Sequence, residues 1–325
     1  MRKVLHVGPC DSPGGMATVM RTLAEYPPDG WEAALLSSHS SDGHWAKWRA
    51  YRRARKELLR RSNSSAERPD IVHFHVASDW SWRRKQRLFM AMKKKGIAAV
   101  FHLHSGQFKQ WLTRRPRRLL NFKKSMTSSR VTVVALSERW SELYEPLIGA
   151  TRWISNPIPP QFIQHQSPRQ GKHLLLLGRP DPVKGHDFAL EVVEELRKIV
   201  PDVTLTMTGS QPSSHEWVDA RGWVTEEEKW ALLHSASVLL LPSIFEGQPL
   251  VALEAESCGL PSIASSSLHS LPSTTIKVER QVQAWVDVIN RLLEQPPLLK
   301  PVDVKAKIER IQTEWAACYD ALLVD

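Results

Sequence analysis

Residues 239–263 read LLLPSIFEGQPLVALEAESCGLPSI, and this stretch decides the fold of the second half of the chain. An apolar run ends at Pro242-Ser243, a turn carries Glu246 to Pro249, and helical spacing follows from about Leu250 to Ser257. A Cys-Gly-Leu-Pro segment then stops the helix, because glycine favours a helix C-terminus and proline cannot continue one. The order strand, loop, helix, strand predicts one unit of a parallel sheet with a ligand-facing loop.

Two glutamates, Glu246 in the turn and Glu254 about one turn inside the helix, lie eight positions apart. Both can face a ligand at the helix N-terminus, where unpaired N–H groups and the positive end of the dipole suit a phosphate or a sugar hydroxyl. With the prolines and glycines in register they form P-S-x-x-E-G-x-P-L-x-x-x-E-A-x-x-x-G-x-P, which resembles the signature of glycosyltransferase family 4. The alternative is an ordinary βαβ unit whose helix carries two solvated glutamates.

The resemblance implies an α/β protein with the GT-B fold, in which two Rossmann-like, doubly wound parallel-sheet domains face a cleft. A length of 325 residues is comfortable for two domains of about 150 residues each. The alternation of expected strands and helices breaks at a Pro-rich run near residues 155–160. We therefore predict an N-terminal domain over 1–160 and a C-terminal domain over 170–300. The resemblance further implies that a C-terminal helix over 302–325 crosses back to the first domain.

The composition is that of a soluble globular protein. No apolar run approaches the ~18 residues that a membrane span needs, and the N-terminus runs straight into an expected strand without signal-peptide features. Cys10, Cys258 and Cys318 are odd in number and scattered, which fits a reducing compartment and excludes a disulfide framework or zinc spacing. These features lead us to expect a cytoplasmic protein.

A glycine-rich turn follows the first expected strand, Lys3 to Val7, and precedes a helical segment. Glycine lets backbone N–H groups approach a ligand closely. The turn lacks the P-loop and dinucleotide-binding spacings, so by itself it fits a plain tight turn equally well. Gly14 and Gly15 resemble the loop that family 4 enzymes place near the donor phosphate and the acceptor.

The segment G-R-x-x-x-x-K-G brings Arg179 and Lys184 to either end of a turn after another expected strand. Two cations at such a place can neutralise the diphosphate that leaves a sugar nucleotide. A solvated basic pair on a loop is the alternative. The position resembles the diphosphate clamp of family 4 enzymes, which favours the functional interpretation.

The resemblance also assigns the rest of the donor site. Glu246 would accept hydrogen bonds from the sugar hydroxyls, and Glu254 from the two ribose hydroxyls. Gly209 and Trp223 would border the base, although a core-packing role is equally compatible with Trp223. Backbone groups around the sugar and at the helix N-terminus would come from Gly247, Gln248, Pro249, Leu250 and Val251.

Two His-x-His pairs, His73 with His75 and His102 with His104, lie at the ends of expected strands. Period-two spacing puts each pair on one face of a sheet, so four imidazoles can converge on a metal ion. Parallel strands also carry buried histidines that bond to backbone groups. His104, before Ser105-Gly106, resembles the histidine that family 4 enzymes place beside the transferred sugar. We therefore expect His104 to position substrate groups and expect no metal and no cofactor.

The first half of the chain is strongly basic. Residues 44–125 hold 23 Lys and Arg against 4 Asp and Glu, a net of +19, whereas the whole chain carries +10. Five tryptophans, Trp45, Trp48, Trp80, Trp82 and Trp111, interleave with these cations. Indole and cation together suit an anionic membrane surface, and we expect no nucleic acid because no nucleic-acid module is recognisable. An acidic polysaccharide is the other partner that this charge would attract.

These features together predict a retaining glycosyltransferase with the catalytic residues Arg179, Lys184, Glu246 and His104. It would move a sugar from a nucleoside-diphosphate sugar to a hydroxyl of a lipid-linked or polysaccharide precursor, peripherally bound at the inner face of the membrane. A sugar-nucleotide epimerase of the same fold and a non-catalytic binding module are the alternatives. The segment after Ser265 departs from the family pattern, because residues 266–277 contain no glycine.

Overall fold

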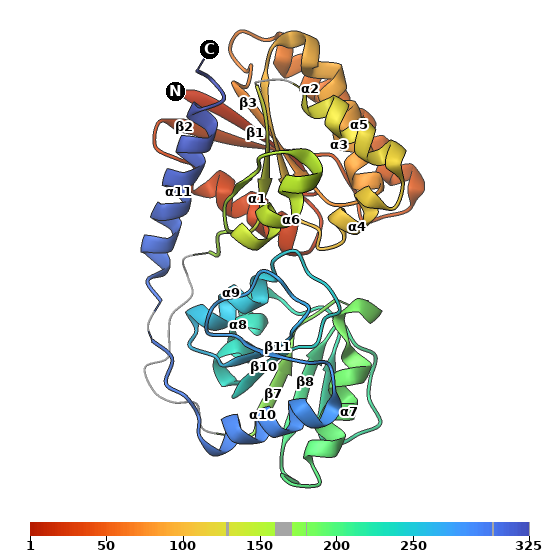
Figure 1. Cartoon of the computed structure of the whole chain (residues 1–325), viewed down its shortest axis with the longest axis vertical. Coiled ribbons are helices and arrows are strands. Elements are labelled where there is room, and N and C mark those ends of the chain that lie inside the picture. Colours follow the sequence, from red (N-terminus) through yellow and green to blue (C-terminus); the bar gives the residue numbers. More distant parts are fainter. Residues whose placement is uncertain (128–129, 160–170, 180, 301, 325) are drawn as a thin grey trace. The chain divides into compact units, whose positions relative to one another are not determined.

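The computed structural model describes residues 1–127, 130–159, 171–179, 181–300 and 302–324. The chain divides into two compact units (Figure 1). Unit 1 consists of residues 1–159 and 305–325, and unit 2 of residues 160–304. Each unit contains one six-stranded sheet whose strands all pair in parallel. The predicted pair of doubly wound α/β sheets is confirmed.

The sheet of unit 1 has the strand order β2-β1-β3-β4-β5-β6. Its strands are β1 (Arg2–Gly8), β2 (Trp31–Ser37), β3 (Ile71–Val76), β4 (Ala98–Leu103), β5 (Val131–Ala135) and β6 (Arg152–Trp153). Its helices are α1 (Gly15–Glu25), α2 (His44–Asn63), α3 (Trp80–Met92), η1 (Lys93–Lys95), α4 (Phe108–Thr113), α5 (Pro116–Met126), α6 (Glu138–Ile148) and α11 (Val304–Asp320). Because the chain steps from β1 outward to β2 and then returns to β3, the topological switch point of this sheet lies between β1 and β3.

Alternation along β3 and β4 sends apolar and imidazole side chains to opposite faces of the unit 1 sheet. Val72, Phe74 and Phe101 pack on one face against Trp82 and other side chains of the main core. His73 and His102 lie on the opposite face, where rings of α11 cover them. Trp82 and Trp111 are only 3% and 8% exposed, so the prediction that they join a surface of tryptophans and cations is wrong.

Helix α11 completes unit 1 from the far end of the chain (Figure 1). The Tyr319 hydroxyl lies 2.8 Å from Nδ1 of His73, and the Tyr319 ring lies 4.9 Å from that of Trp31. Arg2 forms an ion pair with Asp320. The apolar and aromatic face of α11 therefore packs on the same unit as the N-terminal strand.

The sheet of unit 2 has the order β12-β11-β10-β7-β8-β9, which puts its switch point between β7 and β10. Its strands are β7 (His173–Leu176), β8 (Thr204–Thr208), β9 (Val218–Arg221), β10 (Val238–Leu241), β11 (Ser262–Ser265) and β12 (Ile276–Val278). Its helices are η2 (Pro182–Lys184), α7 (His186–Leu196), α8 (Glu226–Ser235), α9 (Leu250–Ser257) and α10 (Val282–Glu294). The glycine-free segment after Ser265 thus leads into an edge strand, β12, that the sequence did not reveal.

Local sequence signals explain several of these boundaries. Thr225 and Glu228 form the predicted capping box at the start of α8, and the Ser137 side chain accepts from the Trp140 N–H at the start of α6. Helix α9 has the expected bounds. None of the helices in the described ranges is long and apolar enough to cross a membrane.

Candidate active site

Two loops meet at the switch point of unit 2, one after β7 and the other after β10. The Ile244 N–H donates to the Val183 carbonyl over 2.9 Å. Gly185 has φ +77°, and a Cβ atom there would lie 2.7 Å from the Pro242 carbonyl oxygen. Only glycine meets both requirements, because the left-handed conformation and the close backbone approach each disfavour a side chain. The lysine-bearing turn is therefore held directly against the glutamate-bearing turn.

Lys184 and Glu246 form an ion pair at this junction. Nζ of Lys184 donates to Oε1 of Glu246 over 2.5 Å, and Oγ of Ser243 donates to the same oxygen over 3.0 Å. The two side chains are 20% and 17% exposed, so the pair is largely shielded but still open to a ligand. The structure thus brings together two residues to which the sequence gave separate roles, the diphosphate and the sugar.

Arg179 lies apart from this pair. Its guanidinium forms an ion pair with Asp181 over 3.1 Å, and its side chain is 69% exposed. Asp181 also accepts from the Val183 N–H over 3.1 Å, which caps the short helix η2. Arg179 is therefore at the rim of the loop, where it has the freedom to reorient toward a bound anion.

Glu254 is buried at the other side of the second loop. Its side chain is 3% exposed, and Oε1 accepts from Nζ of Lys229 over 2.9 Å. Lys229 also pairs with Glu226 over 2.6 Å. Burial raises the pKa of Glu254, and the adjacent Lys229 opposes that shift. The alternative of two solvated glutamates is excluded for Glu254, while sequence reasoning missed Lys229, which reaches Glu254 from α8.

The backbone predicted to surround a ligand lies in these same loops. Helix α9 begins at Leu250 after Pro249, and no side chain caps its N-terminus. The amides of Leu250 and Val251 belong to the first turn, where N–H groups have no intrahelical acceptor. Gly247 and Gln248 lie in the turn immediately before it.

The two residues predicted to border the base are near each other at the end of β8. Gly209, with φ +64°, donates its N–H to the Gly222 carbonyl over 3.0 Å, and Trp223 follows directly. The Trp223 side chain is 65% exposed. The core-packing alternative for Trp223 is therefore wrong, and its ring face is available for stacking.

Unit 1 gathers five histidines rather than the four that the sequence suggested, because His6 on β1 joins them. Nδ1 of His6 lies 3.0 Å from Nε2 of His75, whose Nδ1 lies 3.0 Å from Nε2 of His104. Nε2 of His73 lies 3.2 Å from Nδ1 of His102. His6 has the same alternation as the two His-x-His pairs, but the pairing of β1 with β3 that brings it close is not readable from the sequence.

Burial keeps these imidazoles neutral. It lowers the pKa of His6 and of His104 to about 3, with Lys85 adding to the effect on His104, and it lowers the pKa values of the other three well below the usual range. A neutral imidazole has one donor and one acceptor, so the histidines can bond to one another without a charged member. Two groups, His6-His73-His75 and His75-His102-His104, have ligand atoms within 4.8 Å of one another and can hold a metal ion.

Comparison with known proteins adds to this geometry. Residues 171–295 match the model of the family described as glycosyl transferases group 1. The C-terminal part of the chain is therefore similar to this family of glycosyltransferases. Glycogen synthase of Mycobacterium tuberculosis is 28% identical over 236 residues, covering 66% of this chain and 56% of that protein. D-inositol 3-phosphate glycosyltransferase of Paenarthrobacter aurescens is 33% identical over 110 residues, 29% of this chain and 27% of that protein.

Solved structures confirm the GT-B fold over the whole chain. Sucrose-phosphate synthase of Thermosynechococcus elongatus aligns with a TM-score of 0.72 at 15% identity and covers 99% of both chains. Starch synthase IV of Arabidopsis thaliana, bound to ADP and acarbose, aligns with a TM-score of 0.67 at 14% identity and 99% coverage of both. The first curated relatives are matched over only about half of their length. The match to the family model, over residues 171–295, lies within unit 2.

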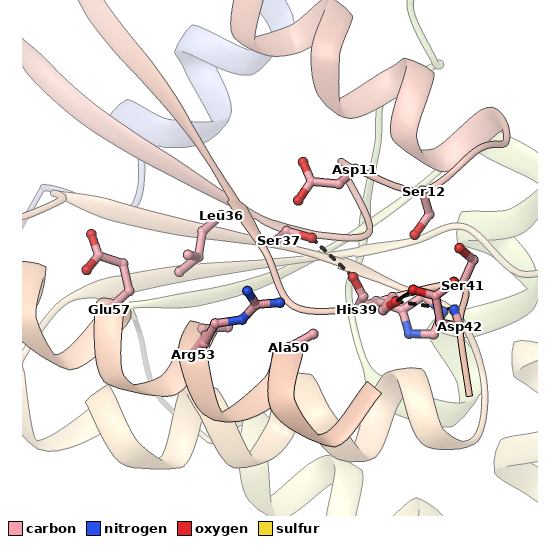
Figure 2. Close-up of a pocket in the computed structure, with 12 residues that line it drawn as sticks. Asp11, Ser12, Leu36, Ser37, His39, Ser41, Asp42, Ala50, Arg53 and Glu57 are labelled. Carbon is pink, nitrogen blue, oxygen red and sulfur yellow. Dashed lines mark hydrogen bonds between the residues drawn. The ribbon is translucent and has the colours of Figure 1, made fainter. Parts of the chain in front are cut away.

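Unit 1 of this GT-B chain also contains a pocket of about 510 Å³, which falls in the usual size range of small-molecule sites (Figure 2). Figure 2 shows Arg53 and Ala50 of α2 on one side and the β1 and β2 loops on the other. Asp11 and Ser12 come from the same loop as Gly14 and Gly15, although those two glycines do not line it. Sequence reasoning missed this pocket, since only the fold brings α2 under the two loops.

Proposed function

We propose that the chain is a retaining glycosyltransferase that takes a nucleoside-diphosphate sugar in unit 2 and an acceptor hydroxyl in unit 1. One observation carries this proposal: the Lys184–Glu246 ion pair at the switch point of a sheet in a glycosyl transferases group 1 domain. Ligands of open parallel sheets bind outside the carboxyl ends of the strands at such a point. A cation and a hydrogen-bond acceptor at this point support the binding of a diphosphate and a sugar there.

In this proposal Lys184 and Arg179 neutralise the departing diphosphate. Negative charge on that group grows as the bond to the sugar breaks, so a fixed cation stabilises the transition state more than the ground state. Glu246 already holds the Lys184 side chain in place, whereas the Arg179 side chain would break its ion pair with Asp181 in order to contact the diphosphate. The N-terminus of α9 adds a positive dipole end, and solved relatives that contain UDP or ADP make a nucleoside diphosphate the natural test ligand.

Glu246 and Glu254 hold the two ends of the donor. Glu246 has one oxygen engaged by Lys184 and Ser243, and its other oxygen would accept from a sugar hydroxyl. Glu254 would accept hydrogen bonds from the ribose hydroxyls, and Lys229 opposes the rise in its pKa that burial causes. Trp223 and Gly209 would border the base.

We propose retention of configuration, and the ion pair of Glu246 with Lys184 supports a route to it without a covalent glycosyl-enzyme. A carboxylate whose charge is already neutralised is a poor nucleophile, so we propose front-face attack in which the leaving phosphate accepts the proton of the incoming hydroxyl. His104 would position substrate groups as a neutral imidazole. We propose no metal and no cofactor in this reaction.

We further propose that unit 1 rests on an anionic membrane surface at the cytoplasmic face, with a lipid-linked or polysaccharide precursor as acceptor. Trp45, Trp48 and Trp80 are 76%, 50% and 64% exposed. The guanidinium of Arg52 lies 5.0 Å from the Trp48 ring centroid, and that of Arg83 lies 5.1 Å from the Trp80 ring centroid. Exposed indoles beside cations suit the headgroup region of acidic lipid.

The deciding experiment is a screen of UDP-, GDP- and ADP-sugars for thermal shift and for slow donor hydrolysis. We expect one nucleotide class to raise the unfolding temperature and to be hydrolysed, and Lys184→Ala to abolish hydrolysis. Binding without any turnover, in the presence of varied acceptors, would indicate a non-catalytic module. Interconversion of the sugar without its release would indicate an epimerase, and no binding at all would overturn the assignment.

A further inference from the structure

Three histidines of unit 1 form a hydrogen-bonded row across neighbouring strands. Nδ1 of His6 lies 3.0 Å from Nε2 of His75, and Nδ1 of His75 lies 3.0 Å from Nε2 of His104. His6 and His75 are 1% and 0% exposed, whereas His104 is only partly buried. We call these three residues the first histidine row. It ends at the residue that we expect to contact substrate.

The register of the strands explains the direction of the first histidine row. His6 pairs with His73 and His75 pairs with His102, so each step to the next strand also moves two residues toward the carboxyl ends. The His104 N–H then donates to a carbonyl of β3 over 2.7 Å, which holds His104 just beyond β4. Ligands of parallel sheets bind at this edge, near a switch point such as the one between β1 and β3. The row therefore leads from the buried part of the sheet to the place where a ligand is expected.

Neutral rings in such a row cannot be protonated independently of one another. A neutral imidazole has one N–H donor and one bare nitrogen that accepts, and the bond made by one nitrogen decides which nitrogen carries the proton. Either all three rings are protonated at Nε2, or all three are protonated at Nδ1. In the first arrangement His104 donates through Nε2 to His75 and has a bare Nδ1. In the second arrangement Nδ1 of His104 carries the proton and is a donor.

The first arrangement is the more stable one. The two end nitrogens, Nε2 of His6 and Nδ1 of His104, are not among the nitrogens of the described residues that are buried without a partner, so water can bond to a proton at either end. The ends of the row therefore do not decide between the arrangements. In a neutral histidine the Nε2–H tautomer is more stable than the Nδ1–H tautomer, and this preference acts in the same direction at all three rings.

A second row in the same cluster ends in a different place. Nδ1 of His102 lies 3.2 Å from Nε2 of His73, whose Nδ1 lies 2.8 Å from the Tyr319 hydroxyl. His73 and His102 are 0% exposed and Tyr319 is 1% exposed, and Nε2 of His102 is buried without a partner in the described ranges. This second row ends on α11 inside the core. It therefore provides a control for the effect of removing a buried hydrogen bond.

We propose that His6 and His75 are positioning residues that keep His104 in its Nε2–H tautomer, so that the bare Nδ1 of His104 accepts a hydrogen bond from a sugar hydroxyl. A bare nitrogen cannot donate to a phosphate oxygen, which separates the role of His104 from that of Lys184. The sugar as binding partner rests on the proposed function, whereas the tautomer of the row does not. His6 and His75 act on substrate only through His104.

Nitrogen NMR of the full chain, with isotope-labelled histidine and no substrate, tests the tautomer, because protonated and bare ring nitrogens have well separated chemical shifts. The spectrum of His104→Gln lacks one pair of signals and so identifies those of His104. At neutral pH we expect a protonated Nε2 and a bare Nδ1 at His104 in the wild type. A protonated Nδ1, or two tautomers in exchange, overturns the proposal.

Variants of the two rows separate a positioning role from a structural one. His75→Leu removes both bonds of the first row, so we expect His104 to exchange between its tautomers. Tyr319→Phe removes one buried hydrogen bond from the second row and is the matched control, which should leave the His104 signals unchanged. Unchanged His104 signals in His75→Leu, or an equal change in Tyr319→Phe, overturns the role of the first row. His6→Leu should also bring the Nδ1–H tautomer of His104 into exchange, and a single Nε2–H tautomer there would remove His6 from the proposal.

Turnover of the donor selected by the nucleotide-sugar screen gives the functional readout. We expect His75→Leu to lower kcat about 2- to 10-fold, the effect of losing one hydrogen bond between neutral groups, and Tyr319→Phe to keep the wild-type kcat. The KM for the donor should change less than kcat, because the nucleotide is bound in unit 2. Wild-type kcat in His75→Leu overturns the positioning role. If donor hydrolysis is absent while His104 has the expected tautomer, the proposed function fails and the assignment of the tautomer stands.

Discussion

The ionisable side chains of the two units differ in whether they have a partner of opposite charge. In unit 2 the functional charges come as pairs: Lys184 with Glu246, Lys229 with Glu254 and Arg179 with Asp181. In unit 1 Lys85 and Arg84 form no ion pair among the described residues, and burial lowers the pKa of Lys85 to about 7 and those of the five histidines below their usual range. Pairs that compensate one another can be held rigid before the ligand arrives, whereas a buried amine or imidazole without a counter-charge favours its neutral form. The comparison indicates that ion pairs preorganise unit 2, whereas burial in unit 1 disfavours charge.

Breaking the central pair of unit 2 should have the largest effect. Lys184→Ala removes the cation that meets the leaving diphosphate and leaves Glu246 uncompensated, so kcat should fall about 100- to 1,000-fold. Lys198→Ala, which removes a lysine that is 66% exposed and paired with Glu195, is the control and should keep wild-type kcat. Steady-state turnover of the preferred donor measures both. Wild-type kcat in Lys184→Ala would remove the pair from the catalytic site.

Variants of the buried Lys229–Glu254 pair test whether nucleotide binding needs the charge of Glu254 or only the rigid structure that the pair maintains. Glu254→Gln keeps the shape but removes the carboxylate, and we expect about 10- to 100-fold weaker nucleotide binding and a lower unfolding temperature, because Lys229 loses its buried partner. The double variant Glu254→Leu/Lys229→Met should recover stability but not binding. Recovery of nucleotide affinity in the double variant would show that Glu254 is only structural. Glu226→Gln, at a carboxylate that is 61% exposed, is the control.

Acid should act on unit 1 first. Since His6 and His104 have pKa values of about 3 when folded, against an ordinary value of 6.5, the unfolded chain binds more protons below pH 6.5. Stability is therefore lost as pH falls from 6.5 toward the folded pKa values, by up to ~1.4 kcal/mol per pH unit for each such histidine. Urea midpoints between pH 7.5 and 5 should show this slope, and His75→Gln should make it shallower. The same slope in His75→Gln and in a variant of the exposed His215 would contradict the role of the cluster.

The histidine groups also allow a direct test for metal. We expect turnover to survive dialysis against a chelator, and the dialysed protein to have the same unfolding temperature, because hydrogen bonds already link the neutral imidazoles. Nε2 of His102 is the exception, since it is buried without a partner among the described residues. Metal content is read by elemental analysis before and after dialysis. Loss of activity that zinc restores would make His75, His102 and His104 ligands and would overturn the metal-free mechanism.

The contrast between the units also explains what the sequence could reveal. The donor loops of unit 2 were predictable because Glu246 and Glu254 stand at fixed spacing in one continuous motif, and the predicted α/β fold followed from the alternation of strands and helices. Lys229 and His6 were not predictable, because each reaches its partners from another element of the sheet. The burial of a side chain was equally hard to predict from the sequence. Trp82 and Trp80 have the same basic sequence surroundings, yet Trp82 lies in the core and Trp80 is 64% exposed.

Since only some of the tryptophans of unit 1 are exposed, the smallest effect that we predict concerns one of these exposed rings. Trp48→Ala removes an exposed ring that packs beside Arg52, and it should weaken binding to anionic vesicles a few-fold, with a further loss as salt screens the cations at about 1 kcal/mol each. Trp223→Ala, at an indole of unit 2 that is 65% exposed against 50% for Trp48, is the matched control and should leave vesicle binding unchanged. Co-sedimentation at low and high salt measures both. Equal binding to neutral and anionic vesicles would show that the +19 charge of residues 44–125 serves a partner other than lipid.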